Sequence, residues 1–259
     1  MIDTHAHLNL PSYQKDLKRV IRTAIQNKVN KIICVSSNIF DSKKSIQIAR
    51  EYPGIIYATV GIHPHKTDPK NYLSYKQKIE ILIKLTREKE VVAIGECGLD
   101  FSQTTAETEN RSLEEQIFLF QKQIEIAQKF NLPIIIHSRK AFLDTIEILS
   151  SYKNLTGVFH CYSAGKRGIK EVLNLGFYFG VDGNLTYDFG LQHIFSQIPV
   201  SKIFLETDSP FLSPYPYRHK RNEPSFLVYT AQKLAEIKKL TLKEIDQITT
   251  QNTINTFSL

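Results

Sequence analysis

The stretch Pro133-Ile134-Ile135-Ile136-His137-Ser138-Arg139 decides how this chain folds. A strand with one face in water alternates apolar and polar residues, whereas an unbroken apolar run indicates a strand buried on both faces, as in a parallel sheet covered by helices. The polar residues His137 and Arg139 follow the apolar run directly. Residues that can carry chemistry therefore stand at the carboxyl end of this predicted strand.

The same arrangement recurs along the chain. Short apolar runs begin near Ile2, Lys31, Ile55, Val91, Pro133, Thr156, Phe177 and Lys202. Their average spacing of about 29 residues is close to the ~30 residues of a strand with its crossover helix. Amphipathic stretches lie between the runs, most clearly at 112–130, and two more follow the eighth strand at 225–240 and 242–253. We therefore predict an α/β fold, a closed (β/α)₈ TIM barrel, as one domain over residues 1–259.

Length and composition agree with this fold class. The 259 residues match the ~250 of a typical barrel. Apolar residues make up 42% and charged residues 23%, which excludes a disordered or fibrous chain. No apolar run approaches the roughly 18 residues of a membrane span, and the first residues lack the layout of a signal peptide. The three cysteines lie far apart and form no disulfide framework, so we expect a cytoplasmic protein without a membrane partner.

In such a barrel the active site forms at the carboxyl ends of the strands. Six of the 8 histidines lie at these predicted ends, namely His5, His7, His63, His65, His137 and His160. Two carboxylates, Glu96 and Asp208, stand at the ends of the fourth and eighth predicted strands. Histidines scattered over a surface would not sort in this way. The pattern therefore predicts one site at the rim of the barrel.

A metal site explains why these histidines and carboxylates gather at the strand ends. The candidate ligands are His5, His7, Glu96, His137, His160 and Asp208. His5 and His7 are two residues apart in a strand, so their side chains point to the same side. Mixed nitrogen and oxygen donors suit Zn²⁺, Mn²⁺ or similar cations. Six ligands exceed what one catalytic ion needs, and a carboxylate such as Glu96 can bridge two ions about 3.5–4 Å apart. Taken singly, each residue would be read as a hydrogen-bonded core residue.

The charges of this predicted site indicate its substrate. Two divalent ions, two carboxylates and a bridging hydroxide leave a net positive charge, which favours an anionic electrophile such as a phosphodiester. Metal-bound water has a pKa near ~7, so hydroxide is available at neutral pH. We expect Glu96 and Asp208 to be catalytic, with Asp208 accepting the proton of that water. Cys97 and Cys161 each follow a ligand by one residue, so strand alternation predicts that their thiols point away from the ions and pack outward in the core, as neither ligands nor nucleophiles.

Eight segments carry a recognisable pattern: Asp3-Thr-His5-Ala-His7-Leu, Gly61-Ile-His63-Pro-His65, Ile94-Gly-Glu96-Cys-Gly-Leu-Asp100, Leu132-Pro-Ile-Ile-Ile-His137-Ser-Arg139, Phe159-His160-Cys-Tyr-Ser163, Leu205-Glu206-Thr-Asp208-Ser-Pro, Arg218-His-Lys-Arg-Asn-Glu-Pro224 and Asn252-Thr-Ile-Asn-Thr-Phe257. With them the chain resembles the TatD family, a branch of the amidohydrolase-like barrels whose members are described as magnesium- or other divalent-metal-dependent deoxyribonucleases. The resemblance implies one ion on His5, His7, Glu96 and Asp208, and a second on Glu96, His137 and His160. Ala164 and His219 stand where the family usually has glycine, which affects loop shape and substrate fit but no ligand.

Further polar residues of the predicted rim are candidates for supporting roles. His63 and His65 could bind a phosphate or a leaving-group oxygen, or could order a loop. Arg139 could hold a phosphate with both arms of its guanidinium, or form a salt bridge at the rim. Glu206 and Asp100 are expected to orient the ligands or Arg139, with ion pairing in the core as the alternative.

A basic run follows the proline-broken loop after the eighth strand. Arg218, Lys220 and Arg221 follow closely after Tyr215 and Tyr217, which would suit a track for phosphates with stacked bases. A solvated loop is the alternative. The net charge of +7 likewise permits a polyanionic partner, although lysine enrichment alone gives the same value.

These observations favour a monomeric, metal-dependent hydrolase that cleaves DNA, preferably single strands or ends, with two divalent ions (Mg²⁺, Mn²⁺ or Zn²⁺). The alternative is that the same site hydrolyses a different bond, as an amide or ester hydrolase or an aminoacyl-tRNA deacylase. A barrel that only binds nucleic acid is the third hypothesis. The sequence does not identify the metal, since His, Glu and Asp donors accept several.

Overall fold

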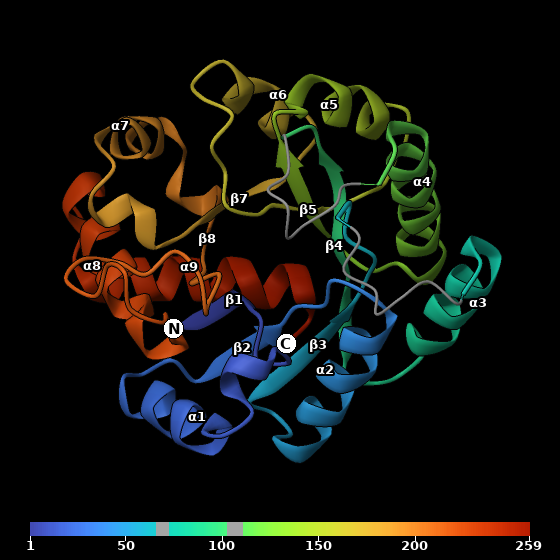
Figure 1. Ribbon diagram of the computed structural model, residues 1–259. Coiled ribbons are helices and arrows are strands. Elements are labelled where there is room, and N and C mark those ends of the chain that lie inside the picture. Colours follow the sequence, from blue (N-terminus) through green and yellow to red (C-terminus); the bar gives the residue numbers. More distant parts are fainter. Residues whose placement is uncertain (66–72, 103–110) are drawn as a thin grey trace.

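Eight strands pair in chain order, each parallel to the next, in a computed structural model that describes residues 1–65, 73–102 and 111–259 (Figure 1). The strands are β1 (Ile2–Ala6), β2 (Lys31–Cys34), β3 (Ile56–Val60), β4 (Val91–Asp100), β5 (Ile134–Arg139), β6 (Gly157–Phe159), β7 (Tyr178–Val181) and β8 (Ile203–Leu205). Every strand begins within one residue of its predicted start. The prediction of an α/β barrel of parallel strands is confirmed.

Hydrogen bonds between β1 and the segment after β8 nearly close the barrel. Ala6 forms a bridge with Ser209, and the amide of His7 donates to the carbonyl of Ser209 over 2.7 Å. The amide of Asp208 donates to the carbonyl of His5 over 2.8 Å. Residues from opposite ends of the sequence therefore lie side by side at this seam.

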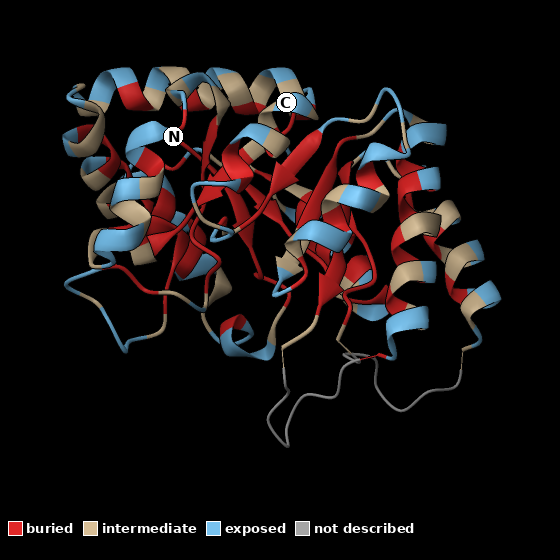
Figure 2. Ribbon diagram, turned by 90° about the horizontal axis from the view of Figure 1, so that it is seen from above, coloured by how far each residue is buried: buried red, intermediate tan, exposed pale blue. Residues whose placement is uncertain are grey.

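Helices surround the sheet, with their exposed faces outward and the strands buried inside (Figure 2). They are α1 (Leu17–Gln26), α2 (Ile39–Glu51), α3 (Tyr75–Leu85), α4 (Leu113–Phe130), α5 (Phe142–Ser150), α6 (Gly168–Asn174), α7 (Phe189–Gln197), α8 (Leu227–Lys238) and α9 (Leu242–Phe257). The predicted helices at 112–130, 225–240 and 242–253 correspond to α4, α8 and α9. Within the described residues, none of these helices has the length and apolar character that a membrane crossing requires.

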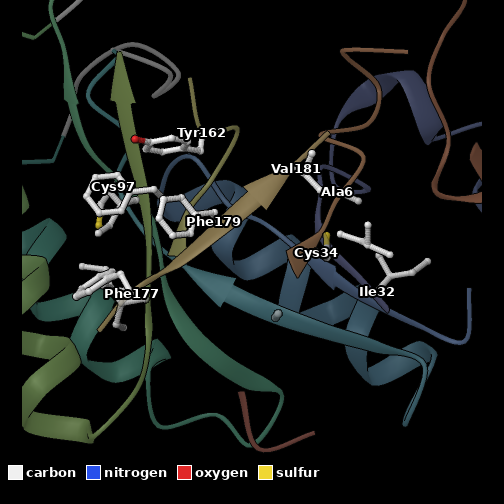
Figure 3. Close-up of a cluster of buried hydrophobic side chains, with 14 of the residues drawn as sticks. Ala6, Ile32, Cys34, Cys97, Tyr162, Phe177, Phe179 and Val181 are labelled. Carbon is white, nitrogen blue, oxygen red and sulfur yellow. The ribbon is translucent and has the colours of Figure 1, made fainter. Parts of the chain in front are cut away.

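The apolar core has two parts because successive side chains of a strand point to opposite faces. Ile32 belongs to the larger cluster, which includes helix residues and therefore fills the space between sheet and helices (Figure 3). Its neighbour Ile33 belongs to a smaller cluster of strand residues and Phe257, whose ring centroid lies 5.5 Å from that of Phe204. This second cluster fills the interior of the barrel with side chains, which leaves the rim at the carboxyl ends of the strands for the predicted site.

Candidate metal centre

His5 and His7 place two imidazoles at the seam between β1 and β8. Both rings are buried, and their Nε2 atoms lie 3.2 Å apart. Asp208 Oδ1 is 3.6 Å from Nε2 of His5 and 3.4 Å from Nε2 of His7. The hydrogen bond from the Asp208 amide to the His5 carbonyl fixes the two chain segments against each other. Two nitrogen donors and one carboxylate thus converge on a common space.

Glu96 connects these groups to the rest of the rim. The pairing of β4 with β5 shifts register between Ile94 and Cys97, and such a bulge re-aims the side chain that it carries. Glu96 Oε2 faces His5 at 3.4 Å and His7 at 3.8 Å. Its other oxygen, Oε1, faces a different set of imidazoles, at 2.8 Å from His137 Nδ1, 3.0 Å from His160 Nε2 and 3.4 Å from His63 Nε2. One buried carboxylate therefore joins two clusters of nitrogen donors.

A further carboxylate contacts the outer ring nitrogen of each of His137 and His160. His137 Nε2 is 3.0 Å from Asp100 Oδ2, and His160 Nδ1 is 3.6 Å from Glu206 Oε1. A carboxylate in this position fixes which ring nitrogen faces the centre and orients the ring. Both acids occupy the places that a supporting role for Asp100 and Glu206 requires, and that role stays a prediction.

Glu206 fits only because β7 has a glycine beside it. A Cβ atom at Gly180 would lie 2.4 Å from Glu206 Oε2, closer than atoms can approach. The Glu206 carboxylate cannot move away freely, since its Oε1 accepts a hydrogen bond from the Cys161 amide over 2.5 Å. The missing side chain of Gly180 therefore leaves the room that the Glu206 carboxylate occupies.

Replacing Gly180 with alanine should lower the free energy of unfolding by about 1–3 kcal/mol, the usual cost of overpacking a buried site. Urea unfolding followed by circular dichroism measures this change. Gly190→Ala is the matched control, because Gly190 is exposed at the start of α7 and a Cβ there would meet the side chain of Asp188, itself exposed, at 3.1 Å. If Gly180→Ala is as stable as the wild type, the Glu206 side chain lies elsewhere.

The donor set fits divalent cations. Three groups each bring one atom per residue within 4.8 Å of one another: His5, His160 and Asp208; His5, His7 and Glu96; His63, Glu96 and His137. Among the described residues, no lysine or arginine pairs with Glu96 or Asp208. A buried carboxylate needs a compensating positive charge, and cations held between these donors would supply it.

The charge states of the two acids agree with this fit. Burial would raise the pKa of Glu96, but the charge of His160 and the hydrogen bonds from His137 and His160 hold that pKa well below its usual value. Burial likewise opposes ionisation of Asp208, but its hydrogen bond to His7 and the charge of His160 lower the pKa of this carboxyl. Both groups are therefore carboxylates at neutral pH, as metal ligands must be.

His63 and His65 extend the site from the end of β3. The His65 amide donates to His63 Nδ1 over 3.0 Å, and His65 Nε2 lies 2.8 Å from Asp100 Oδ2. Burial lowers the pKa of His63 to about 4, so its ring is neutral at pH 7. The sequence suggested a substrate role for His63, whereas its position beside Glu96 and His137 also fits a metal ligand.

A cavity of about 570 Å³ opens above these groups. Its lining combines five of the six candidate ligands with His63, His65 and Arg139, and adds residues that sequence reasoning did not select: Leu10, Ser37, Asn38, Phe40, Asp41 and Phe211. Its volume is within the range of small-ligand sites. The sixth candidate ligand, His5, is fully buried beneath the cavity. Phe211 stands three residues after Asp208, so its proximity could have been inferred, but no sequence signal marked Phe40.

The basic run after β8 does not line this cavity. Arg221 forms ion pairs with Asp16 and Glu223, at 2.6 and 2.8 Å, and the Arg218 guanidinium lies 4.4 Å from the centroid of the Tyr187 ring. Lys220 Nζ lies 5.6 Å from the centroid of the Tyr217 ring. The predicted phosphate contacts of Arg218, Lys220 and Arg221 stay predictions.

Cys161 differs from its expected position. β6 ends at Phe159, and Cys161 has a φ of 48°, so the alternation of a strand no longer applies to it. Its thiol donates to Asp182 Oδ2 over 2.8 Å instead of packing in the apolar core. Burial and the charge of Asp182 raise the pKa of this thiol well above its usual value, which leaves it a poor nucleophile. Cys97 is buried in the core, as expected.

Known metal-dependent hydrolases resemble this chain in sequence and in fold. The family model described as TatD related DNase matches residues 2–258. The chain is 34% identical over 263 residues to the uncharacterized metal-dependent hydrolase YabD of Bacillus subtilis, covering 100% of this chain and 99% of that protein. It is 30% identical over 261 residues to human deoxyribonuclease TATDN3, covering 99% and 94%. The crystal structure of YJJV, a TatD homologue from Escherichia coli, matches with a TM-score of 0.89 at 26% identity, covering 100% and 98%. The chain therefore belongs to the TatD family of metal-dependent hydrolases.

Proposed function

We propose that this protein is a divalent-metal-dependent deoxyribonuclease that hydrolyses phosphodiester bonds in DNA. The position of Glu96 is the observation that carries the proposal, because its two oxygens face separate sets of imidazoles. A carboxylate so placed can bridge two cations, as in two-metal phosphodiesterases. The name of the human relative and the description of the family support DNA as the substrate.

Two cations would be shared among the six candidate ligands. One would be held by His5, His7, Glu96 and Asp208, and the other by Glu96, His137 and His160. When bound, the cations supply Lewis-acid chemistry, since they lower the pKa of water and stabilise negative charge on phosphoryl oxygens. Asp100 would orient the ring of His137, and Glu206 would orient the ring of His160, so that one nitrogen of each ring faces the cation.

Asp208 is the proton acceptor in this proposal. Its lowered pKa keeps it ionised at neutral pH, and its side chain lines the cavity, where it is accessible to water. A carboxylate within reach of the attacking water can take up the proton that the water loses. The hydrogen bond between the Asp208 amide and the His5 carbonyl holds this acceptor in place.

Arg139 and His65 would contact the substrate. The Arg139 side chain lines the cavity and forms no hydrogen bond or ion pair with the other described residues. Its guanidinium would therefore be available to bind two phosphate oxygens at once. His65 is held by Asp100 at 2.8 Å and would bind a phosphate or the leaving-group oxygen. Single strands and ends would enter a cavity of about 570 Å³ more easily than a stiff duplex.

Purified protein loaded with Mg²⁺, Mn²⁺ or Zn²⁺ should cleave end-labelled single-stranded DNA faster than the same sequence as a duplex. Gel electrophoresis of the products measures this, and an Asp208→Asn preparation purified in parallel controls for contaminating nucleases. Aminoacyl-tRNA and p-nitrophenyl esters form a second arm of the assay. Hydrolysis of acyl substrates without cleavage of DNA would overturn the proposal, as would DNA binding without cleavage in all three metals.

A further inference from the structure

Two exposed phenylalanines line the cavity. Phe40, in the first turn of α2, is 62% exposed, and Phe211, in the turn after β8, is 52% exposed. Both line the cavity that contains His7, Glu96 and Asp208. Large apolar side chains left uncovered beside a polar site often mark the place where a ligand packs.

The backbones of both residues are fixed even though the rings are uncovered. The Phe211 amide donates to the Asp208 carbonyl over 2.9 Å, and the Phe211 carbonyl accepts from the buried Asn222 side chain over 2.6 Å. The turn of helix that carries Phe40 is capped by Asn38, whose side chain accepts from the Asp41 amide over 2.8 Å. These contacts fix the backbone that carries both rings before any ligand binds, which reduces the entropy lost on binding.

The Phe211 ring lies directly beside the candidate ligands. The centroid of the Phe211 ring lies 6.0 Å from that of His7, with the ring planes at 68°. His7 in turn has its Nε2 3.4 Å from Asp208 Oδ1. A ligand with an anionic group at the centre would therefore place the neighbouring part of its structure against Phe211 and Phe40.

We propose that Phe40 and Phe211 are a platform for the nucleobase of the nucleotide whose phosphate occupies the centre. This inference rests on the proposed function and adds the part of the substrate that is recognised beside the phosphate. A nucleotide carries an anion and a flat apolar ring a short distance apart, which matches a cavity lined by both metal-ligating groups and two exposed phenylalanine rings. Stacking on phenylalanine uses the face that every base has, so the platform would bind all four bases.

Calorimetric titration with thymidine 5′-monophosphate and with 2-deoxyribose 5-phosphate tests the platform without requiring hydrolysis. The two ligands share the phosphate and the sugar and differ in the base. Mn²⁺-loaded wild-type protein should bind the nucleotide roughly 5- to 150-fold more tightly, the range expected for one stacked base. Phe40→Ala and Phe211→Ala should each reduce this ratio, and the double variant should bring it close to one. Phe211→Tyr should retain most of it, because the ring remains.

Phe189→Ala is the matched control, since Phe189 is 83% exposed on α7 and does not line the cavity. This variant should keep the wild-type ratio. Equal affinity of the wild type for the two ligands, or a double variant that keeps the wild-type ratio, would overturn the platform. A protein that prefers the nucleotide but never cleaves DNA would contradict the proposed function and leave the platform standing. DNA cleavage with no preference between the two ligands would support the proposed function and contradict the platform.

Discussion

Replacing Glu96 with glutamine should leave a folded protein that holds no more than one cation per chain and hydrolyses DNA about 10³-fold more slowly or worse. Glutamine keeps the shape of the side chain but removes the charge that both sets of imidazoles face. Loss of a bridging ligand removes several kcal/mol of electrostatic stabilisation, and each 1.36 kcal/mol is about tenfold in rate. Elemental analysis after dialysis gives the metal content, and kcat/KM on single-stranded DNA gives the rate.

Glu223→Gln is the matched control for this experiment. Glu223 is also buried, but it pairs with Arg19 and Arg221 away from the cavity. This variant should lose stability and retain the metal content of the wild type. A Glu96→Gln protein with two cations and wild-type activity would refute the bridging role.

Asp208→Asn should reduce kcat for DNA by roughly 10²- to 10⁴-fold, the range for loss of a general base. Asparagine cannot take up a proton at neutral pH, although its oxygen can still face His7. The cation held by Glu96, His137 and His160 should remain, so the metal content should fall by no more than one per chain. Single-turnover kinetics, together with elemental analysis, separates the loss of proton transfer from the loss of metal.

Asp182→Asn provides the comparison for Asp208. Asp182 is a buried acid just past the end of the neighbouring β7, but its carboxylate accepts from the Asn184 amide and the Cys161 thiol rather than facing an imidazole. This variant should lose much less activity than Asp208→Asn. Equal losses in the two variants would mean that any buried aspartate at this rim is needed for folding, and would remove the case for proton transfer by Asp208.

The strands could be predicted because burial on both faces leaves a strong mark on the sequence. Runs such as 133–136 contain no polar residue, and all eight begin within one residue of their predicted starts. Parallel strands in a barrel all end at the same rim. The meeting of His5, Glu96, His137 and Asp208 at one centre could therefore be inferred without knowing any loop.

Other features depend on contacts that a linear sequence does not encode. Glu96 reaches both sets of imidazoles because β4 shifts register at that point, and strand periodicity alone predicts no such shift. Phe40 lies in the cavity because of the direction in which α2 begins, which follows from tertiary packing.

The basic run illustrates the same limit for charged residues. The sequence marks Arg221 as a cation but not its partners, and its acidic partner Asp16 stands more than two hundred residues earlier. Such a pair forms only when the segment after β8 packs beside α1. Charge alone therefore suggested nucleic acid contacts for a residue that the fold uses, at least in part, to join distant segments.

The seam between β1 and the residues after β8 links catalytic competence to the order of synthesis. The histidines at one side of the seam are synthesised first, and Asp208 is added only when about four-fifths of the chain has been made. A nascent or truncated polypeptide that ends before this residue lacks both the closing hydrogen bonds and the acid. A partial chain without Asp208 would lack the proposed proton acceptor, so we expect hydrolytic activity to arise only late in synthesis.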